Sequence, residues 1–441
     1  MQSIRNKTVL TGLAIAVGLG LASAAPSVPY ATSGDCAGYP ATRVGMANGY
    51  CMGLVWQGSG RDGPRMPRDI FALENGDWLV SDLGEWRAGR GALWHMSVAK
   101  DGRVRWRRLL SDLSMPHTIA KGPDGRIYLS EMNRILTLEI EATDPQASLR
   151  TVIGGLPDNR LHDNRHPLSS FVFDGNGDLL VNVGAPSDRC LDGAGRPRTT
   201  ARGACVEEAE TGQVRRHAYL GNGRWSEDST VFASGLRNSI ALVRHGSGTI
   251  LQAENSVDLD EPNNPFEEVN ILREGGHYGW PYCVNMQTPL PGWSSAEARC
   301  AQRDKPVALM PPHAAPLDLM YYSGAMFPEL EGKLLSTWHG YRRTAGRIIA
   351  IETGADGVPL TDTNGYYAIY PRGALRYPAD TPSVRGRIIT PHWDRVAGQH
   401  PRGTPVAMAV ARDGSIWVTD DKSRAILRIA RPKMSGNAGL A

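Results

Sequence analysis

The chain has 441 residues, a formal net charge of +3 and 21% charged residues, so its composition gives no sign of a nucleic-acid or anionic-membrane partner. The 50 glycines and 30 prolines favour many short strands and turns over long helices. All-β proteins of this length often form one unit instead of two or three domains.

The first residues form a candidate targeting segment. Arg5 and Lys7 precede an apolar stretch over 9–21, and small residues follow at 22–24. This order is typical of a signal peptide. An uncleaved membrane anchor is the alternative, but the stretch is short for a spanning helix and is interrupted by glycines. The sequence therefore predicts export to the periplasm or the medium, with a mature protein that begins near Ala25.

Six cysteines are consistent with an exported protein, because disulfides persist in oxidising compartments. Six cysteines allow fifteen pairings, but their grouping along the sequence favours three local ones. No cysteine spacing is typical of a zinc site or of covalently attached haem. The predicted pairs are Cys36–Cys51, Cys190–Cys205 and Cys283–Cys300.

One sequence pattern occurs six times. A basic residue opens an apolar strand, a turn with glycine follows, and a second apolar strand ends in a polar residue, most often an acid. Each copy reads as a β-hairpin. The copies lie at 66–82, 115–131, 166–184, 237–254, 313–339 and 402–421.

Further strand-like pieces between the copies bring the count to about four strands per repeat. Four-stranded units repeated in one sequence are typical of a β-propeller, whose radial arrangement protects the sheet edges. We therefore predict an all-β, six-bladed β-propeller with four-stranded blades and long inter-strand loops. The predicted parts are a signal peptide (1–24), an N-terminal leader and closing segment (25–65), the propeller (66–430) and a C-terminal tail (431–441).

The hairpins also predict where a site lies. The start of a hairpin's first strand and the end of its second strand share one end of the blade, so these residues should meet at one mouth of the channel. A ring of basic side chains with a few acids suits a multiply anionic ligand and a cation. The alternative is that each basic residue pairs with its neighbouring acid and only closes the blade. The predicted basic ring is Arg68, His117, His166, Arg237, His313 and Arg402, beside Asp82, Glu131, Glu254, His339 and Asp420.

The sequence resembles the soluble quinoprotein sugar dehydrogenases, the glucose/sorbosone dehydrogenase family. The resemblance covers roughly Met66 to Ile429. Its most specific parts are the stretches 235–238, 268–270 and 275–281, together with His166 ahead of Phe171. The family consists of exported six-bladed propellers that use pyrroloquinoline quinone and calcium, which agrees with the expected anionic ligand and cation.

The resemblance also implies roles for individual residues. His166 matches the general base, and Arg237 and Asn238 match the pair that contacts the quinone carbonyls. The other implied cofactor contacts are Arg402, Arg342, Arg343 and His117, and the implied calcium segment contains Glu254, Ser256 and Val257. The sequence differs from the family pattern at Arg165, where an acid often precedes the base, and at Thr404, where a second arginine is expected.

The implied activity is oxidation of an aldose or a related sugar. Hydride would pass to pyrroloquinoline quinone with His166 as base, aided by Arg237 and calcium, and the electrons would go to a separate acceptor such as a cytochrome or a quinone. Two alternatives stay open at this point: a calcium-dependent propeller hydrolase or lactonase, and a non-catalytic binding propeller.

Overall fold

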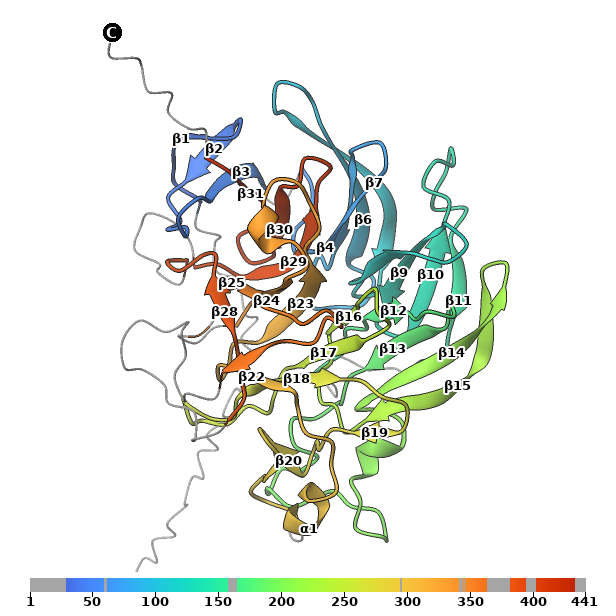
Figure 1. The fold of residues 1–441 in the computed structure, drawn as a ribbon. Helices are drawn as coiled ribbons and strands as arrows, with labels where there is room; N and C mark the ends of the chain where they lie inside the picture. Colours follow the sequence, from blue (N-terminus) through green and yellow to red (C-terminus); the bar gives the residue numbers. More distant parts are fainter. Residues whose placement is uncertain are drawn as a thin grey trace, which may run out of the picture.

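Six small sheets around a common centre make up most of the protein in this computed structural model (Figure 1). The structure describes residues 29–58, 62–157, 165–293, 296–340, 344, 346–362, 381–393 and 402–432. The predicted signal peptide therefore lies outside the described residues. The sheets form a six-bladed β-propeller, which confirms the predicted fold class.

Blades one, two and five are meanders of four antiparallel strands, as predicted. Blade one contains β4 (Pro67–Ala72), β5 (Trp78–Asp82), β6 (Gly91–Val98) and β7 (Val104–Leu113). Blade two contains β8 (Ile119–Lys121), β9 (Ile127–Glu131), β10 (Arg134–Leu138) and β11 (Arg150–Ile153). Blade five contains β23 (Pro316–Tyr321), β24 (Leu334–Trp338), β25 (Arg347–Ile351) and β28 (Gly386–Ile388).

Blades three and four carry strands beyond the predicted four, because long loops return to their outer edges. Blade three contains β12 (Phe171–Phe173), β13 (Leu179–Val183), β14 (Gln213–Gly221) and β15 (Arg224–Ser234), with β19 (Gly276–His277) added in parallel. Blade four contains β16 (Ala241–Arg244), β17 (Ile250–Glu254), β18 (Glu267–Ile271) and β22 (Ala308–Met310), followed by β27 (Ser383–Val384) and β26 (Thr361–Asp362).

The N-terminal part of the described residues completes blade six. This blade contains β29 (Pro405–Val410), β30 (Ile416–Asp420), β31 (Ala425–Ala430), β3 (Cys51–Gln57), β2 (Tyr39–Thr42) and β1 (Thr32–Cys36). Strand β3 pairs antiparallel with β31, so the two ends of the propeller are joined within one sheet. Backbone hydrogen bonds between segments far apart in the sequence therefore close the ring.

A repeated hydroxyl contact links neighbouring blades near the centre. In four of the six blades, the fourth residue of the second strand is a serine or threonine. Its hydroxyl donates a hydrogen bond to a backbone carbonyl of the next blade. Ser81 donates to His117 at 2.6 Å, and Ser130 donates to Ser169 at 2.6 Å. Thr337 donates to Val406 at 2.7 Å, and Thr419 of blade six donates to Arg68 of blade one at 2.6 Å. These buried hydrogen bonds set the register in which the first strands of adjacent blades meet.

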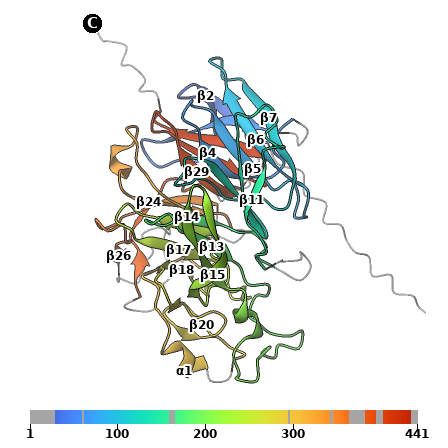
Figure 2. The ribbon, with the colours of Figure 1, turned by 90° about the vertical axis from the view of Figure 1, so that its right-hand side faces the viewer.

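An extension outside the blades lies at the opposite end of the molecule from β1 and β2 in both views (Figure 2). It contains the hairpin of β20 (Cys283–Val284) and β21 (Thr288–Pro289) and the short helix α1 (Ala296–Cys300). Among the described residues, the other helical turns are η1 (Val206–Ala209) and η2 (Pro328–Leu330). Within the described residues, no helix has both the length and the apolar character needed to span a membrane.

All three predicted disulfides are confirmed: Cys36–Cys51, Cys190–Cys205 and Cys283–Cys300. The first joins β1 to β3 in blade six. The second lies in a loop beside the extension and the third lies within the extension, and the two share one buried apolar cluster.

Candidate active site

A cavity of about 340 Å³ lies where the first strands begin and the second strands end. Blades one, three, four, five and six all contribute to its wall, as the hairpin geometry predicts. Its lining includes Met66, Arg68, Trp86, Arg165, His166, Asn238, Asn255, His339, Asp421 and Lys422. Arg68 and His166 are the members of the predicted basic ring found on this wall, whereas His117, Arg237, His313 and Arg402 lie off it.

His166 is the buried histidine of this wall, with 8% of its surface exposed. Its Nδ1 lies 2.6 Å from the backbone oxygen of Ala185. Because a carbonyl oxygen can only accept, Nδ1 carries the hydrogen, and Nε2 is the unprotonated nitrogen of the neutral ring. Burial, followed by the nearby Arg237, lowers the pKa of His166 well below its usual value. His166 is therefore neutral at pH 7 and able to accept a proton.

The orienting partner of His166 is thus a backbone carbonyl. The sequence did not identify this partner, because Arg165 stands where the family often has an acid before the base. The amide of Ala185 donates to the carbonyl of Arg237 at 2.8 Å, which ties the orienting residue to the entry of blade four. Gly184 allows the close approach, since a Cβ there would lie 2.6 Å from the backbone oxygen of His166. A side chain at this position would displace the histidine.

The acids that end the second strands bind backbone amides. Asp82 accepts from the amides of Arg65 at 3.0 Å and Met66 at 2.8 Å, and Glu254 accepts from those of Arg237 at 2.7 Å and Asn238 at 2.8 Å. These carboxylates therefore close the blades, as the alternative interpretation proposed, but through backbone amides. The basic side chains have other partners.

Arg237 is held by acids from two loops. Its Nη2 lies 2.8 Å from Asp188 Oδ1 and 3.1 Å from Asp258 Oδ2, and its Nη1 donates to the carbonyl of Asn255 at 2.9 Å. Its side chain is 5% exposed. Asn238, the next residue, lines the large cavity. The resemblance implies that Arg237 and Asn238 contact the same ligand. In the structure, Arg237 lines the small cavity described below and Asn238 lines the large one.

A buried ion pair forms part of the cavity wall. Arg68 Nη1 is 2.7 Å from Asp421 Oδ2, and His339 Nε2 is 2.9 Å from Asp421 Oδ1. Burial alone would raise the pKa of Asp421, but His339 and Arg68 hold it well below its usual range. His117 is buried nearby, and burial and the charge of Arg68 lower its pKa. The acid predicted to end the second strand of blade six at the mouth was Asp420. Asp420 instead accepts a hydrogen bond from the hydroxyl of Tyr30 at 2.6 Å.

A second, small cavity of about 10 Å³ adjoins this region, with room for about one water-sized particle. Glu254, Ser256 and Val257, the residues of the implied calcium segment, all line it, and so does Glu268. Burial raises the pKa of Glu254 to about 7 and that of Glu268 well above its usual value. Buried carboxylate oxygens of this kind suit a hard cation such as Ca²⁺.

The carboxylate of Glu254 is already hydrogen-bonded by the protein. One oxygen accepts from the two amides named above, and the other accepts from Gln252 Nε2 at 2.6 Å and Ser239 Oγ at 3.3 Å. Its role as a metal ligand stays a prediction. Among the remaining predicted contacts, Arg402 is partly exposed. Arg342 and Arg343 lie outside the described residues.

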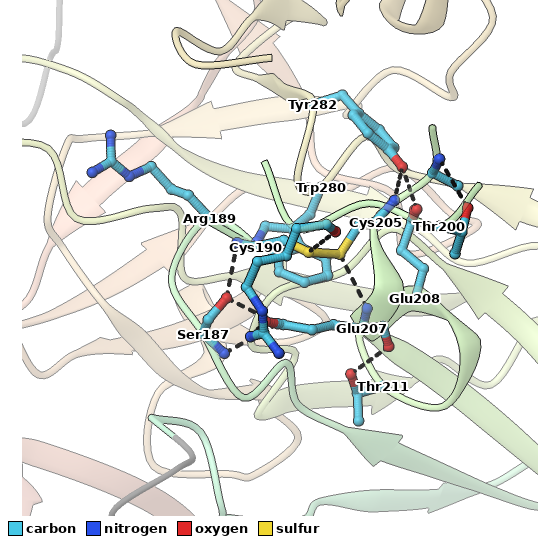
Figure 3. The surroundings of a disulfide bond; sticks show 12 residues. Ser187, Arg189, Cys190, Thr200, Cys205, Glu207, Glu208, Thr211, Trp280 and Tyr282 are labelled. Carbon is cyan, nitrogen blue, oxygen red and sulfur yellow. Dashed lines mark hydrogen bonds and ion pairs between the residues drawn. A yellow bond between two sulfur atoms is a disulfide. The ribbon is translucent and has the colours of Figure 1, made fainter. Parts of the chain in front are cut away.

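The loop that carries Asp188 is cross-linked beside the site. Figure 3 shows the disulfide Cys190–Cys205 against Trp280, with Ser187 and Arg189 from the same loop. Trp280 Nε1 donates to the backbone oxygen of Asp188 at 2.9 Å. The disulfide and the indole therefore fix the carboxylate that pairs with Arg237.

Sequence reasoning missed several residues of the large cavity. Lys422 lies two residues after Asp420, the predicted acid of blade six, and Asn255 directly follows Glu254, that of blade four. The hairpin register could therefore have included both. Trp86 lies in the loop after β5, where no periodicity marks it.

Known proteins are similar in sequence to this protein over most of the propeller. The family model described as TrAA12-like matches residues 44–432. A pyrroloquinoline quinone-dependent pyranose dehydrogenase of Coprinopsis cinerea is 27% identical over an alignment of 327 residues. The alignment covers 66% of this protein and 42% of the relative. The match thus spans less than half the length of that curated relative.

Two solved structures share the fold. The calcium structure of the family AA12 enzyme from Trichoderma reesei has a TM-score of 0.64 and 19% identity, covering 89% of this protein and 98% of the other. The holo form of the quinone domain of the Coprinopsis cinerea pyranose dehydrogenase has a TM-score of 0.62 and 21% identity, covering 90% and 99%.

Proposed function

The protein belongs to the TrAA12-like family, and from this membership we propose that it oxidises a sugar with bound pyrroloquinoline quinone and calcium. The observation that carries the proposal is the neutral, oriented His166 on a cavity wall that also holds cationic side chains. The relatives that bind this quinone support the choice of cofactor.

The large cavity fits the quinone in size and charge. Its volume of about 340 Å³ lies within the range of about 300–1,000 Å³ typical of small-molecule sites. Arg68, Arg165 and Lys422 line it against one carboxylate, Asp421, so a ligand with three carboxylates meets a net positive wall. We assign the cofactor carboxylates to Arg165 and Lys422. The contact from Arg402, which lies off this wall, stays a prediction.

The small cavity is where calcium would be held. The residues that would hold it are Ser256, Val257 and Glu254, as the resemblance implies, together with Glu268. A cation there would offset the charge of the buried carboxylates, whose ionised forms are otherwise disfavoured by burial.

His166 acts as the general base in this proposal. Nε2 would take the proton of the sugar hydroxyl. Bound quinone would supply the two-electron acceptor for the hydride of the carbon that bears this hydroxyl. The carbonyl of Ala185 keeps Nδ1 protonated and stabilises the imidazolium that forms. Arg237 lines the small cavity. Burial and, after it, the charge of Arg237 lower the pKa of His166 and so favour its neutral form before the reaction. The predicted direct contact between Arg237 and the quinone stays a prediction, as does the separate electron acceptor.

Export stays part of the proposal. The targeting segment lies outside the described residues, and the three disulfides favour an oxidising compartment.

Reconstitution separates the proposal from its rivals. Purified protein with added quinone and calcium should reduce a redox dye when supplied with a panel of aldoses. Hydrolysis of lactones or aryl esters, without dye reduction, would favour the hydrolase. Neither activity in folded, quinone-loaded protein would favour a binding propeller.

Calcium and the quinone together are expected to raise the melting temperature of the purified protein. Ligands that bind only the folded state stabilise it by mass action, by about 2.7 kcal/mol at one hundred times the dissociation constant. The measurement is a thermal melt with each ligand alone and with both. A melting temperature that does not move with an excess of both would contradict the cofactor assignment.

Removing the Cys190–Cys205 disulfide by a double change to alanine is expected to lower the free energy of unfolding by about 3 kcal/mol, because a cross-link of this span restricts the unfolded state. The affinity for the quinone should also fall, since the loop with Asp188 loses its restraint. Urea unfolding and quinone titration measure the two effects.

The Cys36–Cys51 pair is a matched control, because both pairs have a sequence separation of 15. Its removal should lower stability similarly and leave quinone affinity unchanged. Equal quinone affinities in the two double variants would show that the disulfide does not support the site.

A further inference from the structure

We infer that Trp86 is a stacking platform for a pyranose ring at the mouth of the large cavity; this inference rests on the proposed sugar oxidation and names a residue that selects its substrate. Trp86 is 47% exposed, although an indole is usually buried. The other large hydrophobic side chains exposed among the described residues are Val206, Leu220 and Val231. None of those three lines the cavity.

The loop that presents Trp86 is braced at several points. The amide of Leu83 donates to the carbonyl of Met66 at 3.0 Å, and the amide of Gly84 donates to Asp82 Oδ1 at 2.9 Å. Gly84 has φ +68°, and a Cβ there would lie 1.9 Å from the carbonyl oxygen of Arg90, so the two ends of the loop are in direct contact. The indole is therefore presented by an ordered loop.

A buried cation underlies the indole. The guanidinium carbon of Arg68 lies 5.9 Å from the centroid of the Trp86 ring, and Arg68 is itself fixed by Asp421 at 2.7 Å. A cation over an indole face is attracted by the ring quadrupole. This contact holds the orientation of the ring while almost half of its surface stays open to a ligand.

The volume of the cavity places the sugar at this mouth. About 340 Å³ is near the lower end of the range of about 300–1,000 Å³ for small-molecule sites. A tricyclic quinone would fill much of it, so a sugar must bind between the quinone and the solvent. The C–H groups of a pyranose ring form an apolar face, and an indole has a large apolar face with negative charge density to receive it. An acyclic polyol has no such face.

The test compares Trp86→Ala and Trp86→Phe with Leu220→Ala, which removes an exposed hydrophobic side chain that lines no described cavity. Trp86→Ala should raise KM for an aldopyranose by about 5- to 150-fold, the range for loss of an aromatic stacking partner. Turnover at saturation should change much less. Trp86→Phe should retain part of the effect, and Leu220→Ala should match the wild type.

Saturation-transfer NMR gives a readout without turnover. Protein loaded with quinone and calcium and carrying His166→Ala is mixed with glucose, galactose, xylose or the acyclic polyol sorbitol. The platform predicts strong transfer to the axial ring hydrogens of at least one pyranose, little to sorbitol, and loss of the pyranose signal with Trp86→Ala. No transfer to any pyranose, or transfer that survives Trp86→Ala, would overturn the platform.

Quinone titration distinguishes a sugar platform from the other possible role of Trp86, which is to cover the cofactor. If Trp86 covers the cofactor instead of the sugar, Trp86→Ala will weaken quinone binding by more than about twofold, beyond the usual effect of a surface substitution. That result would also overturn the inference. Failure of the proposed function is a different observation, namely wild-type protein that binds a sugar but reduces no dye.

Discussion

Replacing His166 by alanine is expected to lower turnover per bound quinone by a factor of about 10² to 10⁴, the usual contribution of a positioned base. The structure gives the reason. The ring is neutral because of its burial, and Ala185 holds the Nδ1 hydrogen, so Nε2 is the basic nitrogen. Quinone affinity should change little, since the cationic side chains are untouched.

The measurement is turnover normalised to bound quinone in purified protein. His245→Ala is a suitable control, because His245 lies in the turn between β16 and β17 and is not on the cavity wall. If His166→Ala keeps more than about a third of wild-type turnover, far above the range for a lost base, the assignment of the base is wrong.

Replacing Asp421 by asparagine is expected to lower the free energy of unfolding by about 3–5 kcal/mol, because it leaves a buried arginine without its countercharge. Arg68 and Asp421 both have side chains that are 2% exposed. The contrast is Asp101→Asn, which removes the exposed Arg103–Asp101 pair and should change stability little. Urea unfolding at pH 7 measures both variants.

Acid should reduce the difference between the wild type and Asp421→Asn. The pKa of Asp421 is depressed in the folded state, so its contribution is present above the pKa of the unfolded state, about 3.9, and is lost as the pH falls toward the folded value. The stability gap should therefore shrink below about pH 4. A gap that is absent at pH 7 would show that the ion pair contributes nothing to the fold.

The propeller could be predicted because each of its hairpins is specified by residues close together in the sequence. Each hairpin contains an apolar strand, a glycine turn and a second apolar strand, and this pattern alone determines the end of the blade at which Arg68 and His166 lie. The pairing of β3 with β31, which joins the two ends of the propeller, brings together residues far apart in the sequence. The additional strands of blades three and four were not predicted, because short β pairs formed by long loops have no periodic signal.

The partners of the site residues could not be predicted, because they lie far away in the sequence. Arg237 turns toward Asp188 and Asp258, two acids on separate loops, and no local pattern connects them. The strand-end acid of blade six that lines the cavity is Asp421 and not the predicted Asp420. The difference is one residue at a strand end, where the side-chain direction reverses with each position. The position of Trp86 at the cavity depends on the path of its loop, and tertiary contacts determine that path.

The most direct test of the central claim is reduction of the bound quinone by sugar in a single turnover. Protein loaded with one equivalent of quinone and with calcium is mixed anaerobically with each aldose of the panel, without dye, and the absorption of the oxidised quinone is followed. We predict loss of that absorption with at least one aldose, one oxidised sugar per quinone, and a much slower loss with His166→Ala. An unchanged spectrum with every aldose, in folded protein shown to hold the quinone, would contradict the account.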